Sequence, residues 1–335
     1  MTTILTTCKK EDRHPLLTKV FRRELSGDLL KSDYDRAYLF DAQPLDVGSI
    51  HDLHEALTWL EDQPHSCLIR GEPIGATRAI RRALNDCSDR GPATIRPSSG
   101  GLQWQMLDFD HVPVGTMGLD DSEARLRYLV NLLPRAFHGA SYHYQWSSSA
   151  GLDDWASLSC HLWFWLTEPW LCRTLYERFH DGDFTDCEVD PAPFTPNQVH
   201  YTACPMFRDM SDPVSSRSGF VLGDQDAVEL PVWRKPLAPA IDFPSRAHAE
   251  HLGRSQFEAL LADIGPHYHR PILRAVAHYF AVTQPVDVDE EWLEGRVREA
   301  IHNAVHGRNR KADYLDAHYL RRVIQGARKF GRVSS

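Results

Sequence analysis

Two aspartates, one residue apart, end an apolar stretch that covers residues 102–110. In an extended strand the side chains alternate between faces, so Asp108 and Asp110 share one face while Leu107 and Phe109 point to the other. Carboxylates this close repel each other unless a cation neutralises them. The pair therefore predicts a site for a hard divalent ion such as Mg²⁺ or Mn²⁺, which prefers oxygen ligands. The plainer alternative is a strand that runs into a polar turn.

A serine and a histidine lie on a second strand-like segment, residues 157–166. Its alternation predicts a buried face made of Leu158, Cys160, Leu162, Phe164 and Leu166. The other face presents Ser159 and His161, whose hydroxyl and imidazole groups can donate hydrogen bonds to phosphate oxygens. Trp163 and Trp165 share that face, where they either stack on bases or pack a core. A strand-filling serine and a structural histidine are the ordinary alternatives.

A third acidic region follows a predicted helix over residues 170–180. Three acids in it, Asp186, Glu188 and Asp190, compete for the role of a further metal ligand. Arg217 lies beyond them, where a guanidinium suits contacts to a triphosphate or a template. The alternative for Arg217 is an ordinary surface arginine.

Coarse patterns place these residues within a chain of mixed helices and strands. Ser49 is suited to cap a helix over residues 50–60, and the Gly/Pro/Ser-rich residues 91–101 form a loop before the acidic strand. The other predicted elements are a strand at 66–71, helices at 77–85 and 122–133, strands at 142–146 and 198–203, and a hairpin of 218–223 with 228–233. Residues 1–36 show few periodic apolar positions, which predicts a peripheral arm.

Beyond a proline-rich linker at residues 231–244, the pattern changes to helices alone. The predicted helices cover residues 245–264, 267–282, 289–305 and 313–329. Basic residues gather in the last part of this region: Arg308, Arg310, Lys311, Arg321, Arg322, Arg328, Lys329 and Arg332. Such a composition, with Tyr314 and Tyr319 interleaved, suits template phosphates, and the alternative is a solvated helical face.

The composition is that of an ordinary globular protein. The chain has 335 residues, of which 42% are hydrophobic and 25% charged. A net charge of -9 argues against a protein that coats nucleic acid indiscriminately. The seven cysteines contain no Cys-x-x-Cys pair, which argues against a zinc ribbon or a disulfide framework. With no apolar signal core and no membrane-spanning run, we expect a soluble cytoplasmic protein without membrane contact.

Taken in order, Asp-x-Asp, Ser-x-His and an apolar residue before an acid resemble the motif set of the archaeo-eukaryotic primase, or primase-polymerase, superfamily. Within it the chain is most similar to the divergent replication primases of phages, plasmids and other mobile elements. The resemblance covers roughly residues 60–235 and favours Asp190 as the third acid, because Val189 precedes it. It implies an α+β fold, with an N-terminal α/β unit and an RRM-like antiparallel sheet. The expected domains are an arm at 1–36, a catalytic domain at 37–240 and an all-helical accessory domain at 245–335.

The resemblance implies synthesis of short primers on single-stranded DNA. Asp108, Asp110 and Asp190 would then be catalytic and hold Mg²⁺ or Mn²⁺, while Ser159, His161 and Arg217 would bind the nucleotide. The implied partners are nucleoside triphosphates and the DNA template, with room for a replicative helicase. Two other functions fit the same residues: a metal-dependent nuclease, and a replication-initiation protein that binds DNA without catalysis.

Overall fold

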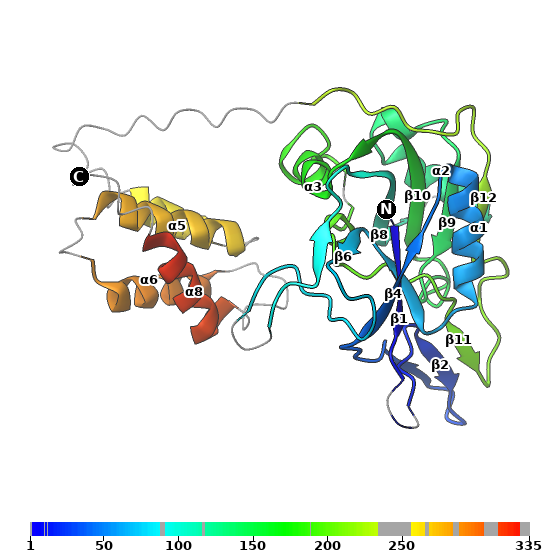
Figure 1. Ribbon diagram of the computed structural model, residues 1–335, viewed down its shortest axis with the longest axis horizontal. Coiled ribbons are helices and arrows are strands. Elements are labelled where there is room, and N and C mark those ends of the chain that lie inside the picture. The colour runs from blue at the N-terminus through cyan, green and yellow to red at the C-terminus, as the bar shows by residue number, and fades with distance from the viewer. Residues whose placement is uncertain are drawn as a thin grey trace. The chain divides into compact units, whose positions relative to one another are not determined.

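The computed structural model describes residues 2–9, 11, 13–87, 91–115, 118–187, 189–233, 256–264, 268–283, 288–304 and 314–328. The protein is α+β, and it divides into two compact units, Met1–Pro236 and Leu237–Ser335 (Figure 1). The first unit holds all the described strands and the predicted site residues, and the second is built from helices.

The first unit is organised around a four-stranded antiparallel sheet with the order β12-β9-β10-β8. Its strands are β8 (Leu102–Pro113), β9 (Tyr142–Trp146), β10 (Ser157–Trp170) and β12 (Ser218–Val221). The two longest strands, β8 and β10, pair along most of their length, so the Asp-x-Asp and Ser-x-His segments lie on adjacent strands. The predicted acidic strand and the strand at 157–166 are confirmed, the second with four more residues at its end.

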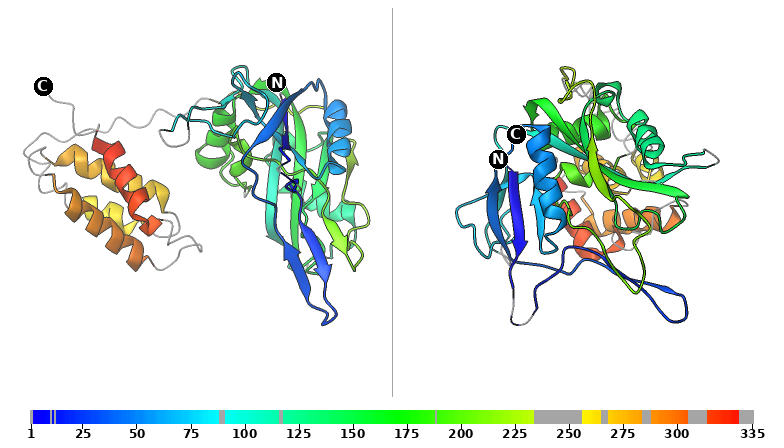
Figure 2. Two further views of the ribbon diagram at one scale, coloured as in Figure 1. Left: turned by 60° about the horizontal axis from the view of Figure 1, so that its bottom comes forward. Right: turned by 90° about the vertical axis from the view of Figure 1, so that its right-hand side faces the viewer.

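Helices cover both faces of this sheet (Figure 2). One face packs against α2 (Ser122–Asn131), the short η1 (Arg135–Phe137) and α3 (Cys172–Asp181). The residues predicted to face the core from 157–166 all lie in this cluster. The opposite face packs against α1 (Ile50–Glu61) and carries Trp163 and Trp165, which are buried in a second core. These two tryptophans therefore pack a core and do not stack on bases.

Residues 1–36 are part of the folded unit rather than a peripheral arm. β1 (Thr2–Thr7) is the central strand of a second antiparallel sheet, between β4 (Phe40–Leu45) and β5 (Ser66–Ile69). The Trp104 indole N–H donates to the Thr2 hydroxyl at 2.7 Å, which ties this sheet to the central one. Four of the six β1 residues are threonines, a type that suits strands but hides the apolar alternation by which a strand is recognised.

A third sheet projects from this unit with the order β11-β2-β3 (Figures 1 and 2). β2 (Val20–Arg23) and β3 (Leu29–Ser32) form an exposed hairpin, and β11 (Met206–Arg208) pairs with β2 in parallel. The segment after β3 returns to the core, where Tyr34 stacks on Tyr201 with ring centres 3.6 Å apart. A short pair, β6 (Gly71–Pro73) with β7 (Ile95–Pro97), completes the strands described.

Three other predicted elements differ in the structure. Residues 77–85 form no helix, because Ile80 makes a bridge to Phe40 and so extends the edge of β4 instead. Residues 198–203 make only one bridge, between His200 and Leu68. The predicted hairpin of 218–223 with 228–233 does not form either: β12 pairs with β9, and Val228 makes a parallel bridge to Leu166.

The second unit contains α5 (His269–Val282), α6 (Glu290–Asn303) and α8 (Ala317–Ala327), with residues 256–262 also helical. Its core is separate from those of the first unit and includes Ile272, Leu293, Val297 and Leu320, all 0% exposed. The predicted helices at 267–282, 289–305 and 313–329 are confirmed within the described residues, and residues 245–255 of the first predicted helix lie outside them. Among the described helices, none is long and apolar enough to cross a membrane.

Candidate active site

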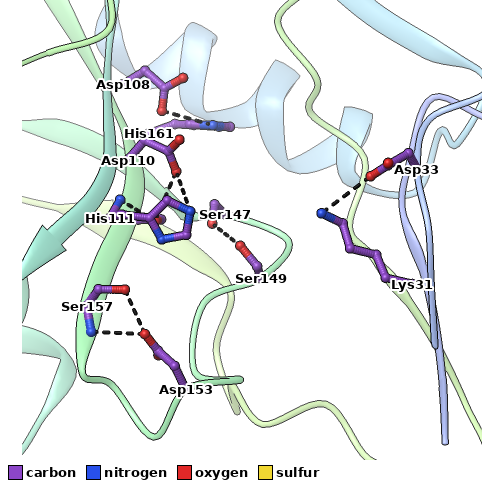
Figure 3. A network of polar contacts seen from close by, with 11 residues as sticks. Lys31, Asp33, Asp108, Asp110, His111, Ser147, Ser149, Asp153, Ser157 and His161 are labelled. Atoms are coloured by element: carbon purple, nitrogen blue, oxygen red, sulfur yellow. Dashed lines mark hydrogen bonds and ion pairs between the residues drawn. The ribbon is translucent and has the colours of Figure 1, made fainter. Parts of the chain in front are cut away.

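The pairing of β8 with β10 sets the first aspartate against the histidine. His161 lies directly opposite Asp108 in the register, and its Nε2 is 3.5 Å from Asp108 Oδ1 (Figure 3). On its other side His161 lies opposite Gln145 of β9. The Asp108 and His161 side chains therefore share one face of the sheet, as strand alternation predicts, while Leu107 and Phe109 are buried on the other.

A β-bulge shapes the end of β8 at the second aspartate. The register with β10 shifts between Leu158 and Cys160, and His111 on β8 has a φ of 55°. The Ser159 hydroxyl accepts from the His111 backbone N–H at 2.8 Å and donates to Asp110 Oδ1 at 3.3 Å. Ser159 thus stabilises the bulge and orients the Asp110 carboxylate.

Asp190 lies beside the pair. Its backbone N–H donates to the Asp108 carbonyl at 2.9 Å, and its own carboxylate accepts from the Ala192 N–H at 2.8 Å. The second contact closes an Asx turn just before η2 (Ala192–Phe194), which fixes Asp190 at the start of a turn. Among the competing acids, Asp186 is exposed and has no such contact to the strand, and Glu188 lies outside the described residues. The structure thus brings Asp190 to Asp108.

The charges of the three carboxylates act on one another. Burial raises the pKa of Asp108 to about 8, and the carboxylates of Asp190 and Asp110 add to the rise, while Lys19 opposes it. Burial also lowers the pKa of His161 to about 4, so this imidazole is neutral at pH 7 and has one N–H to donate. Its Nδ1 is buried and has no hydrogen-bond partner among the described residues.

The donor chemistry of this cluster suits Mg²⁺ or Mn²⁺, since it offers carboxylate oxygens that repel each other. Within the residues described here, however, no three His, Cys, Asp or Glu side chains come close enough together to hold a metal ion. The Asp190 and Asp110 carboxylates are exposed and bound only by single hydrogen bonds or a long ion pair. Side-chain rotation of these two residues would be needed to close a metal site.

Arg217, predicted to bind the nucleotide, is buried and engaged in contacts within the protein. Its guanidinium donates twice to Asp212, at 2.7 and 2.6 Å, and once to the Ser147 carbonyl at 2.6 Å. The side chain is 5% exposed. As described, Arg217 holds the start of the loop between β9 and β10, and a contact to nucleotide remains a prediction.

Two residues near the site were missed because they lie in the segment predicted to be an arm. Lys19 precedes β2, and its ammonium group lies 5.1 Å from the centre of the Tyr34 ring. The Tyr34 hydroxyl lies near Ser148, in the loop that leads to Ser159 and His161. The hairpin in this segment has a weak signature in the sequence. Ser26, Gly27 and Asp28 are typical turn residues, and they lie between two short runs of apolar and basic residues.

The basic residues of the C-terminal unit are only partly free. Arg328 forms a bidentate pair with Glu290, at 2.5 and 2.7 Å, whereas Arg321 and Arg322 are exposed on α8. The other predicted contributors lie outside the described residues: Arg308, Arg310, Lys311, Lys329 and Arg332. Template binding by this face therefore stays a prediction.

Comparison with known proteins gives little beyond this geometry. No protein-family description and no curated protein matches the chain. Among solved structures, the chain is similar to the crystal structure of primase RepB', with 12% sequence identity and a TM-score of 0.21 over 99% of this chain and 94% of that one. A TM-score this low does not establish a shared fold, so the functional conclusion rests on the site itself.

Proposed function

We propose that this chain synthesises short primers on single-stranded DNA by metal-assisted nucleotidyl transfer, on a primase-like core. The observation that carries the proposal is the alignment of Asp-x-Asp with Ser-x-His across β8 and β10, with Asp190 hydrogen-bonded to the backbone of Asp108. The carboxyl groups of Asp108, Asp110 and Asp190 and a neutral imidazole are then near one another, and rotation of the Asp110 and Asp190 side chains would bring the three around a cation. That set matches the needs of phosphoryl chemistry, which calls for cation ligands beside a phosphate donor.

Each residue has a distinct task in this proposal. Mg²⁺ or Mn²⁺, when bound, would assist the attack of a 3′-hydroxyl on the α-phosphate and stabilise the departing pyrophosphate. Asp108, Asp110 and Asp190 would hold the metal. His161, neutral at pH 7, would donate a hydrogen bond to a phosphate oxygen. Ser159 would act as a positioning residue, because its hydroxyl is engaged by the His111 N–H and by Asp110.

The test is primer synthesis by the variant Asp108→Asn with Asp110→Asn, which removes both carboxyl groups as metal ligands and keeps the side-chain size. The matched control is Asp153→Asn, since Asp153 is an exposed aspartate that only binds Ser157 in the same region (Figure 3). We expect synthesis from labelled nucleoside triphosphates on single-stranded DNA to fall at least a hundredfold in the double variant. The control variant should retain it.

The same reactions separate the other two functions. A nuclease would shorten a labelled single-stranded DNA and make no product from nucleotides. A non-catalytic DNA-binding protein would retain DNA on a filter with and without divalent metal, and synthesise nothing. Primer synthesis that persists in a double variant with wild-type circular dichroism and an unchanged unfolding midpoint would overturn the proposal.

A further inference from the structure

Thr18 and Lys19, the two residues before β2, are held by hydrogen bonds to residues 204–206. The Thr18 hydroxyl donates to the Cys204 carbonyl at 2.7 Å, and the Lys19 carbonyl accepts from the Met206 N–H at 2.9 Å. β2 then continues in parallel beside β11. Residues 204–208, which follow Asp190 in the sequence, therefore hold Lys19 in place. Lys19 itself lies about 170 residues before Asp190.

The Lys19 side chain is directed by aromatic packing. Its ammonium group lies 5.1 Å from the centre of the Tyr34 ring, within the range of a cation–π contact. Tyr34 in turn stacks on Tyr201, with the two rings 4° from parallel. Lys19 is half-buried, and among the described residues it forms no ion pair, whereas its neighbour Lys31 pairs with Asp33 at 3.4 Å.

Contacts connect Lys19 to the strand that carries His161. Tyr201, on which Tyr34 stacks, is followed by Thr202, whose carbonyl accepts from the Gln145 side-chain amide at 2.6 Å, and Gln145 lies opposite His161 in the sheet. The Asp110 carboxylate is close enough to act on the Lys19 charge. Burial and the nearby Lys31 lower the pKa of Lys19. Figure 3 shows Lys31 and Asp33, from the hairpin segment, on the side of the view opposite Asp108 and His161. Lys31 is paired with Asp33 and lies apart from the carboxylate cluster.

We propose that Lys19 binds the phosphates of the incoming nucleoside triphosphate. The inference rests on the proposed function and adds a binding residue to it. A triphosphate carries several negative charges, so a site made of carboxylates needs a cation beside them to accept it. The cation predicted for that task, Arg217, is buried and its charge is paired with Asp212. Lys19 has an ammonium group with three donors and no carboxylate partner among the described residues, which suits a phosphate.

A reactive ATP analogue tests this on the unaltered protein. In an acyl-phosphate derivative of ATP, a nearby lysine amine attacks the acyl carbonyl, an amide forms, the bond from that carbonyl to the phosphate oxygen breaks, and ATP leaves while the amine proton passes to water. Peptide mass spectrometry then identifies the labelled lysine. We expect labelling of Lys19, blocked by excess ATP and not by AMP. Labelling confined to other lysines, or labelling of Lys19 that ATP does not block, overturns the inference.

Variants give an independent kinetic test. Lys19→Gln should raise the KM for nucleoside triphosphate about tenfold with a small change in kcat, because a binding contact shared by ground state and transition state is lost. Lys19→Arg should restore part of the loss, and the control Lys31→Gln should match the wild type. If the wild type makes primers and Lys19→Gln keeps its KM, the inference fails while the proposed function stands. If the wild type makes no primers under any of these conditions, the proposed function fails and the inference fails with it.

Discussion

The hydroxyl of Ser159 illustrates how one small side chain serves the candidate site. It accepts from the His111 N–H at the bulge and donates to Asp110, so both of its hydrogen-bonding roles are used within the protein. The residue-level motif Ser-x-His predicted a nucleotide contact for this serine. In the described structure its contacts are with the acidic strand, and a single hydroxyl has one proton to donate.

This arrangement makes a prediction at Ser159. Ser159→Ala should loosen the bulge and the Asp110 carboxylate, so the Mg²⁺ concentration for half-maximal primer synthesis should rise severalfold while the KM for nucleotide stays near the wild-type value. Titrating metal at saturating nucleotide, and nucleotide at saturating metal, separates the two effects. The opposite pattern, a higher KM with an unchanged metal requirement, would instead assign Ser159 to the nucleotide.

At the scale of elements, α3 is fixed to the unit by a buried arginine. Arg178 is 0% exposed and makes a bidentate pair with Asp183, at 3.0 and 2.6 Å, while its third donor binds the Pro231 carbonyl at 2.9 Å. The guanidinium also lies 4.2 Å from the centre of the Phe184 ring. This one side chain joins α3 to the turn that leads toward Asp190 and to Pro231 near the end of the unit.

We therefore expect Arg178→Met to lower the free energy of unfolding by about 3 kcal/mol, because it leaves Asp183 without its partner and the Pro231 carbonyl without a donor. The control is Arg173→Met on the same helix, where an exposed arginine pairs with Glu177. That surface pair should be worth at most about 0.5 kcal/mol. Urea unfolding of both variants measures the difference, and equal losses would contradict the account of Arg178.

Elements with strong local signals were predictable from the sequence. Ser49 caps α1 by accepting from the Asp52 N–H, and Asp121 caps α2 by accepting from the Ala124 N–H. The alternation in β10 also gave the correct buried face. These features depend on residues near one another in the chain, so local patterns suffice.

Elements that depend on distant partners were not predictable in the same way. β1 reads as Thr-Thr-Ile-Leu-Thr-Thr and becomes a strand because β4 and β5 supply hydrogen-bond partners on both sides. Residues 77–85 have helical spacing, yet Ile80 pairs with the edge of β4. Within the site, the motifs identified Asp108, Asp110 and His161, but Lys19 was missed because nothing local connects it to an aspartate far along the chain.

At the scale of the whole molecule, the two units have separate hydrophobic cores, and a buried histidine links stability of the first unit to pH. His200 is 1% exposed, between Trp104 and Trp163, and neither ring nitrogen has a hydrogen-bond partner among the described residues. Burial, with the charge of Arg70 and of His161 when protonated, holds the pKa of His200 well below its usual range. The folded protein therefore keeps this histidine neutral.

The sign of the pH effect follows from this pKa. Unfolded His200 takes up a proton below about pH 6.5 and folded His200 does not, so the contribution of this residue to stability is full above that pH and is lost as the solution is acidified, by up to about 1.4 kcal/mol per pH unit. Asp108 and His161 titrate in the same range, so the contribution of His200 is measured as the difference between wild type and variant in urea unfolding at pH 7.5 and 5.5. His200→Phe should reduce the pH dependence, and His51→Gln, at an exposed position, should not. An unchanged slope in His200→Phe would refute this explanation.

The central position of β1 has a consequence for biosynthesis. Its residues are made before those of β5, which lie about 60 residues later, and the Trp104 indole that binds Thr2 is 102 residues away. At roughly 5–20 residues per second, the ribosome needs about 5–20 s to supply that tryptophan. During this interval an uncharged segment of β-branched residues must wait without its full set of hydrogen-bond partners, and such a segment is prone to pair with strands of other chains until β5 arrives.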